Sequence, residues 1–448
     1  MNNIKKALVF AAASGAATFA MATPVVSDVT MTQNSGRKVT ITYKLSENAV
    51  VTLNVLTNAT PNAATGWASI GGEAICNAQG AVWRKVTSAD ADGNGNYTIT
   101  WHPDQSWKDE FGNGFKVADG CAKAVVTAWS LNNTPNYMVV DISATGGADT
   151  QKYYPAADFV PGGVTSDHYK TATLLMRKIM AKDVTWTMGS VSESGRTSGR
   201  EKPHQVTLAN NYYTGVYPVT QTQWLLIEDY NPSRYTAEYS MRPVEMVGYT
   251  DIRQGHGSAS AAASQTGGVY PAAPYESSFL GKLRTKTSID FDLPSDAQWE
   301  FAARAGHGEG YWGDGSPISI SNNKDDNLNL LGRYLNNPSD NSSTSDDASR
   351  SPSVGGTSIV GTYAPNSWGL YDVYGNVNEW CLDYYVGDNS TLNGAVNTSG
   401  NEYTNRIKRG GSWSNKAGEC RSAYRDADSA NRRLSTIGFR VVCTAGLE

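Results

Sequence analysis

Residues 369–380 read GLYDVYGNVNEW, a short stretch in which two carboxylates flank a turn. Asp372 and Glu379 stand at its two sides, with Gly375 and Val377 between them. This spacing lets the two carboxylates and two main-chain oxygens converge on one ion, and Ca²⁺ prefers such hard oxygen ligands. The stretch therefore predicts a calcium site. The alternative is that the two acidic side chains only cap a turn.

Further segments surround this stretch and extend its pattern along the chain. They are 186–190 (WTMGS), 217–221 (YPVTQ), 231–233 (NPS), 242–245 (RPVE), 293–300 (LPSDAQWE), 409–413 (RGGSW) and 437–440 (IGFR). Taken in this order, they resemble the formylglycine-generating enzyme family, also called sulfatase-modifying factors. The resemblance covers nearly all of residues 170–445. It implies a C-type-lectin-like fold with little regular structure, and bound calcium for which Gly375 and Val377 supply main-chain oxygens.

The resemblance also implies an active site. Enzymes of the family bind Cu(I) between two cysteines and use oxygen to convert a substrate cysteine into formylglycine; soft thiolates suit Cu(I). Counting forward from residues 410–412 places the first catalytic position at Asn415. Counting back from residues 438–440, through the Arg-x-Ala-x-Arg stretch at 421–425, places the second at Ala417. The catalytic cysteine pair is absent on this register, so copper is not expected.

The cysteine beside these positions has a different expected role. Cys420 and Ser412 lie near Asn415 in the sequence. Cys420 stands next to an arginine of the family pattern, and we expect it to form a disulfide with Cys381 or Cys443. One of these three thiols then remains free or pairs between molecules.

The loop from residue 414 to 436 mixes small anchoring residues with polar side chains of varied character. This layout resembles the ligand-binding variable region of lectin-fold proteins that are diversified by retroelements. The alternative is an ordinary polar surface loop. The expected ligand-binding residues are Trp413, Ser414, Asn415, Lys416, Glu419, Tyr424, Asp426, Asp428, Asn431 and Arg432.

Composition excludes two classes of function. The 448 residues contain 37 Lys and Arg against 42 Asp and Glu, a net charge of −5, so no general positive excess is available for nucleic acid. After the N-terminal region no segment approaches the roughly 20 continuous apolar residues of a membrane span. With 40% hydrophobic residues, the chain can bury folded cores.

The first residues have the pattern of a secretory signal peptide. Lys5 and Lys6 precede an uncharged run of small and apolar residues from 7 to 22, which ends in the A-x-A sequence at 20–22. We expect cleavage before Thr23 and a secreted, periplasmic or cell-surface protein. The alternative is a buried N-terminal helix.

The region that follows alternates between apolar and polar residues. Short alternating runs separated by turn residues, at 39–45, 51–55, 97–101, 125–129 and 138–142, predict a small all-β sandwich over residues 23–145. Small residues and prolines at 146–169 predict a linker. In an oxidising compartment Cys76 and Cys121, the two cysteines of this region, are expected to form a disulfide.

The sequence thus predicts an α+β protein with two domains after residues 1–22, the second over residues 170–448. Two short helices are expected there, one capped by Thr220 and one capped by Ser295. The predicted function is a calcium-stabilised extracellular binding or display module for an unknown ligand or protein. The alternative is a formylglycine-generating oxidase, or a related oxidoreductase, acting on a protein cysteine.

Overall fold

A computed structural model describes most of the chain. The described residues are 23–34, 36–109, 111–112, 114, 118–143, 150–236, 239–255, 273–337, 356–397 and 405–447. The expected signal peptide at residues 1–22 lies outside them. Within these ranges no helix combines the length and the apolar character needed to cross a membrane.

The N-terminal region forms two antiparallel sheets over a shared core. One sheet has the order β1-β2-β7-β5, with β1 (Val26–Gln33), β2 (Val39–Leu45), β7 (Tyr97–Trp101) and β5 (Gln79–Gly80). In the other, β3 (Ala49–Thr57) pairs with β4 (Ala68–Ser69), β6 (Lys85–Val86) and β8 (Ala122–Trp129). Alternate residues of these strands, such as Ile41, Leu53 and Ile99, are buried between the sheets. The connections contain α1 (Pro103–Ser106), η1 (Glu73–Ile75) and η2 (Ser88–Asp90).

A five-stranded antiparallel sheet follows. Two of its strands come from segments that the sequence predicts to belong to the sandwich and to the linker. Its order is β10-β9-β11-β14-β19, with β10 (Gln151–Tyr154), β9 (Tyr137–Asp141), β11 (Thr173–Ile179), β14 (Tyr212–Gly215) and β19 (Val442–Thr444). Thus β9 comes from the range 23–145 expected for the sandwich, and β10 from the expected linker 146–169. Met138 and Val140 alternate as predicted, but they pack with Leu174 and Met176 in the core of the second domain.

Both expected helices of the second domain form with the expected caps. The Thr220 hydroxyl accepts a hydrogen bond from the Gln223 N–H at the start of α2 (Gln221–Leu225), and the Ser295 hydroxyl accepts one from the Gln298 N–H at the start of α5 (Asp296–Arg304). Each hydroxyl satisfies a main-chain donor that the first helical turn leaves unpaired. The other helices are α3 (Tyr249–Arg253), α4 (Phe279–Thr287) and α6 (Leu328–Leu331), with 3₁₀ turns η4 (Ala157–Phe159), η5 (Asp167–Lys170), η6 (Tyr239–Met241) and η8 (Ala417–Cys420).

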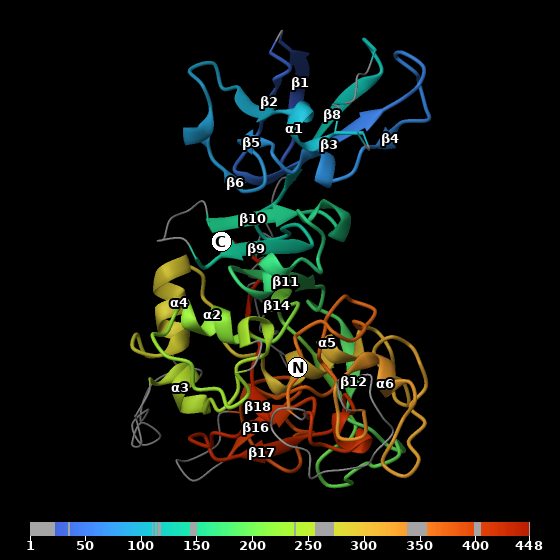
Figure 1. Ribbon diagram of the computed structural model, residues 1–448, viewed down its shortest axis with the longest axis vertical. Coiled ribbons are helices and arrows are strands. Elements are labelled where there is room, and N and C mark those ends of the chain that lie inside the picture. The colour runs from blue at the N-terminus through green and yellow to red at the C-terminus, as the bar shows by residue number, and fades with distance from the viewer. Residues whose placement is uncertain are drawn as a thin grey trace, which may run out of the picture.

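The rest of the second domain is built from short strands and long irregular segments. A four-stranded sheet has the order β17-β16-β15-β18, with β17 (Asp426–Asp428), β16 (Arg406–Arg409), β15 (Asn378–Tyr384) and β18 (Ile437–Gly438), and β12 (Thr185–Met188) pairs with β13 (His204–Thr207). Helix α5 packs against β12, β15 and β16. Figure 1 shows β1–β6 and β8 at one end of the long axis and β16–β18 at the other. The fold is α+β, because it consists mainly of β-sheets with a small number of short helices.

Candidate functional site

The charged residues of the sequence motifs are buried and bind one another. Glu379 on β15 accepts hydrogen bonds from Arg440 through both carboxylate oxygens, from Nε at 2.6 Å and from Nη2 at 2.7 Å. The Trp299 indole donates a third bond to the same carboxylate at 2.7 Å. Glu379 and Arg440 are fully enclosed. The pair therefore joins β15 to the segment that follows β18.

A second group of buried charges surrounds α5. Arg409 of β16 forms ion pairs with Asp296, with 2.8 Å between Nε and Oδ1, and with Glu300. Arg425 binds the other oxygen of Asp296 at 2.8 Å, and Arg304 binds Glu300 from within the helix. Burial alone raises the pKa of Glu300, but Arg304 and Arg409 outweigh it and hold that pKa below the usual value. The network fixes α5 to β16 and to the loop after η8.

A third buried group attaches a distant loop to the same region. Arg421 forms ion pairs with Glu193 at 2.6 Å and with Glu201 at 2.9 Å, and its Nη2 also donates to Glu201 at 3.0 Å. All three side chains are enclosed. Sequence reasoning missed Glu193 and Glu201 because no motif or spacing links them to an arginine more than 200 positions later.

Asn415 and Ala417, the two positions that the sequence predicts as the family's catalytic positions, lie close to these buried groups. The Asn415 side chain accepts hydrogen bonds from the Ser412 hydroxyl at 2.6 Å and from Asn378 at 3.2 Å, and donates one to Glu419 at 3.0 Å. Ala417 opens η8 and has no exposed surface. Neither side chain offers a thiolate, and the amide is fully engaged in holding the turn.

Cys420 is the last residue of η8, is buried and forms no disulfide. Its sulfur packs against Gly411, where an added Cβ would lie 2.6 Å from Sγ. Burial raises the pKa of the Cys420 thiol far above its ordinary range, so the reactive thiolate is strongly disfavoured. Cys381 and Cys443 are also buried free thiols. The disulfide expected between Cys420 and either of them is not formed.

The prediction of a disulfide between Cys76 and Cys121 is also wrong, because both residues are free cysteines. Cys76 ends the turn η1, whose Ala74 carbonyl is bound by the Trp101 indole. Cys121 starts the segment leading into β8, with its sulfur 3.8 Å from the Ala59 carbonyl. Belonging to one domain does not bring two cysteines within bonding distance.

The two acidic residues expected to bind calcium already accept hydrogen bonds from the protein. The buried Asp372 accepts hydrogen bonds from the Gly361 N–H at 2.7 Å and the Asn376 amide at 3.1 Å, and burial raises its pKa to about 6. Both oxygens of Glu379 are already bound by Arg440 and Trp299.

Gly375 and Val377 occupy the turn between the two acids, and Gly375 has a φ of +92° in the left-handed region. No cluster of three or more His, Cys, Asp or Glu side chains suited to a metal occurs in the described part of the chain. As arranged, one of the two expected carboxylates, Glu379, is already paired with Arg440. Calcium binding here stays a prediction from the sequence.

The ten expected ligand-binding residues divide into two groups. Lys416, Asn431 and Arg432 are exposed, and the others are partly buried. The Trp413 ring packs edge-on against Tyr235, with 5.5 Å between centroids, and its indole donates to the Ser435 carbonyl. One turn next to Ser412 contains five of the ten residues, namely Trp413, Ser414, Asn415, Lys416 and Glu419.

The remaining members extend this surface along β17. Asp426 and Asp428 both bind the Lys408 ammonium, at 3.0 Å and 3.5 Å. Asn431 and Arg432 follow in the exposed turn after the strand. Tyr424 precedes β17, and its carbonyl accepts a hydrogen bond from Arg409. The predicted residues thus lie on two segments, the turn that follows Gly411 and the stretch from Tyr424 to Arg432.

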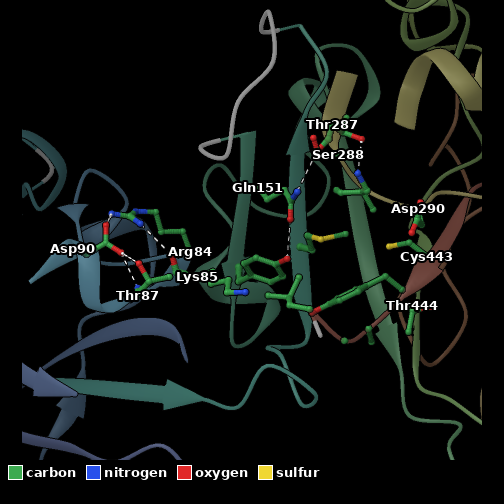
Figure 2. A pocket seen from close by; sticks show the side chains of 17 residues that line it. Arg84, Lys85, Thr87, Asp90, Gln151, Thr287, Ser288, Asp290, Cys443 and Thr444 are labelled. Atoms are coloured by element: carbon green, nitrogen blue, oxygen red, sulfur yellow. Dashed lines mark hydrogen bonds and ion pairs between the residues drawn. The ribbon is translucent and has the colours of Figure 1, made fainter. Parts of the chain in front are cut away.

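A cavity of about 790 Å³ lies elsewhere, where the sandwich meets the five-stranded sheet. Figure 2 shows Arg84 paired with Asp90 on one side and Gln151 reaching Thr287 on the other. Cys443 lines the same cavity. Sequence reasoning missed it because its walls come from segments far apart in the chain. Arg84, Asp90 and Gln151 are engaged with protein partners, and the lining indicates no particular ligand.

Comparison with known proteins identifies the class of the second domain. The family described as Sulfatase-modifying factor enzyme 1-like domain matches residues 169–445, and this chain belongs to that family. The chaperone protein LppX of Paenibacillus barcinonensis is 27% identical over 279 residues, covering 59% of this chain and 90% of LppX. The formylglycine-generating enzyme of Mus musculus is 30% identical over 154 residues, covering 33% of this chain and 38% of that enzyme.

Among solved structures, the Treponema denticola variable protein 1 covers 61% of this chain and 96% of its own, with 24% identity and a TM-score of 0.44. The relatives of this chain thus include proteins of different kinds, a formylglycine-generating enzyme and a chaperone protein among them. Membership alone therefore does not assign this chain an activity.

The cysteine placement gives a direct prediction. In the native, full-length protein a maleimide reagent should modify Cys76, which is partly exposed, much faster than the four buried cysteines. All five should react after unfolding without a reductant, because none is oxidised. Peptide mass mapping under non-reducing conditions measures both results. A linked pair of cysteine peptides would contradict this arrangement.

Proposed function

We propose that this protein acts outside the cytoplasm as a binding module. Its C-terminal domain, with a C-type-lectin-like fold, presents the polar surface between Trp413 and Arg432 to an extracellular ligand. The proposal for its location rests on the basic and apolar pattern of the first 22 residues, which is typical of a signal peptide.

The observation that carries the proposal is the state of the two family catalytic positions. Asn415 uses its side chain to bind Ser412, Asn378 and Glu419, and Ala417 is enclosed at the start of η8. An amide oxygen is a hard and weak ligand for Cu(I), and alanine supplies no ligand at all. A two-thiolate copper site cannot form from these side chains.

The division between framework and surface also supports binding. Buried ion pairs hold the segments in place, so the fold does not depend on the exposed side chains of these segments. Lys416 and Arg432 project from this surface without a role in the buried network. Such a division suits a protein whose contact residues change while its fold persists.

The first test is enzymatic. The full-length protein, supplied with copper and a thiol reductant, should not convert the cysteine of a sulfatase-motif peptide into formylglycine, as read by peptide mass. The Cys420→Ser variant serves as the matched control and should be equally inactive. Formylglycine formed by the natural sequence and lost in Cys420→Ser would favour the alternative, a formylglycine-generating oxidase that uses a single cysteine.

The second test concerns the surface itself. Lys416→Ala and Arg432→Ala should each change the free energy of unfolding by less than about 0.5 kcal/mol, as is usual for exposed positions. Asn415→Ala should cost about 1–3 kcal/mol, because it leaves buried hydrogen-bonding partners unsatisfied. Denaturant unfolding measures all three. Comparable losses in the exposed variants would mean that this surface is structural rather than available for a ligand.

A further inference from the structure

A larger cavity lies in the N-terminal sandwich, outside the residues that match the family. Its volume is about 900 Å³, within the range of small-molecule sites. The ends of β1 and β2, the end of β7, helix α1 and the loop before β8 contribute its lining. It is thus independent of the polar surface proposed above for the second domain.

Two stacked tryptophans form part of the lining. Trp101 is almost fully buried, and its indole N–H donates to the Ala74 carbonyl at 3.0 Å. Trp107 is half-buried and stacks on it, with 6.2 Å between ring centroids and 24° between planes. Because Trp101 is fixed in the core, Trp107 is supported as a rigid platform. Met31 and Val39 extend the apolar part of the lining.

Polar groups stand beside this platform. Asp104 lines the cavity, and within the described residues its Oδ1 is shielded from solvent and has no hydrogen-bond partner. Such an oxygen is unfavourable as placed, and rotation of the Asp104 side chain would bring it to a ligand hydroxyl in the cavity. Arg37 and Lys108 add two cations, and Asp119 adds a second carboxylate. The charged side chains of the described lining are therefore balanced, two of each sign.

We propose that this cavity binds a neutral saccharide of a few sugar units. Sugars combine C–H faces, which pack on the electron-rich face of an indole, with hydroxyls that both donate to a carboxylate and accept from a cation. A nucleotide would also stack on indole, but its phosphates favour a positive excess, which the described residues of the lining lack. The sandwich then anchors the protein on a glycan while the second domain engages its own ligand.

The test uses the full-length protein with three probes: cellotetraose, chitotetraose and maltotetraose. At least one should bind in a calorimetric titration at concentrations up to the millimolar range. Trp107→Ala should weaken that binding by about tenfold or more, through loss of the stacking platform. Asp104→Asn, which keeps the side-chain shape but removes the charge, should weaken it as well.

Trp67→Ala is the matched control, because Trp67 lies in the same domain but outside the cavity lining, with the Lys123 ammonium 4.2 Å above its ring. Its saccharide binding should be unchanged. Failure of all three probes to bind would overturn the proposal, as would binding that both Trp107→Ala and Asp104→Asn leave intact. Neither result would affect the proposed role of the second domain, since that role is tested on different residues.

Discussion

An arginine buried away from water must have a carboxylate beside it, because an unpaired charge in a protein interior is strongly unfavourable. The second domain depends on this constraint at Arg409, Arg421 and Arg440, all fully enclosed. Each reaches acids supplied by remote segments, such as Glu379 for Arg440 and Glu201 for Arg421. Since the domain has few and short regular elements, these pairs fix irregular segments that main-chain hydrogen bonding alone leaves undetermined.

This constraint can be met without the family's catalytic cysteine pair, which the sequence predicts to be absent. The motif residues around α5, β15 and β16 serve mainly to neutralise one another, and that task is independent of any copper site. Asn415 and Ala417, which the sequence predicts at the two thiolate positions, are held within this framework. The same framework leaves exposed side chains such as Lys416 and Arg432 outside its contacts, which is what a binding surface requires.

Much of the fold could be predicted because local patterns determine it. The alternation in residues 39–45 and 97–101 identified strands that pair as β2 and β7, and Ser295 was recognisable as the cap of α5. The rest depends on partners that a local pattern does not name. Residues 138–142 have a strand pattern, but which core they join is decided by packing with β11. Likewise, the spacing of Asp372 and Glu379 suggests a metal, whereas Arg440, which binds Glu379, lies 61 positions further along.

The most direct test of this account is a double-mutant cycle on Glu379 and Arg440, measured by denaturant unfolding. Glu379→Gln and Arg440→Met should each cost about 3–5 kcal/mol, because each leaves its partner charged, buried and unpaired. The double variant removes both charges and should lose clearly less than the sum of the two. The exposed pair Lys202 and Asp388, treated in the same way, should show a much smaller coupling, because solvent screens it. Losses at Glu379 and Arg440 that add to within about 0.5 kcal/mol would contradict the account.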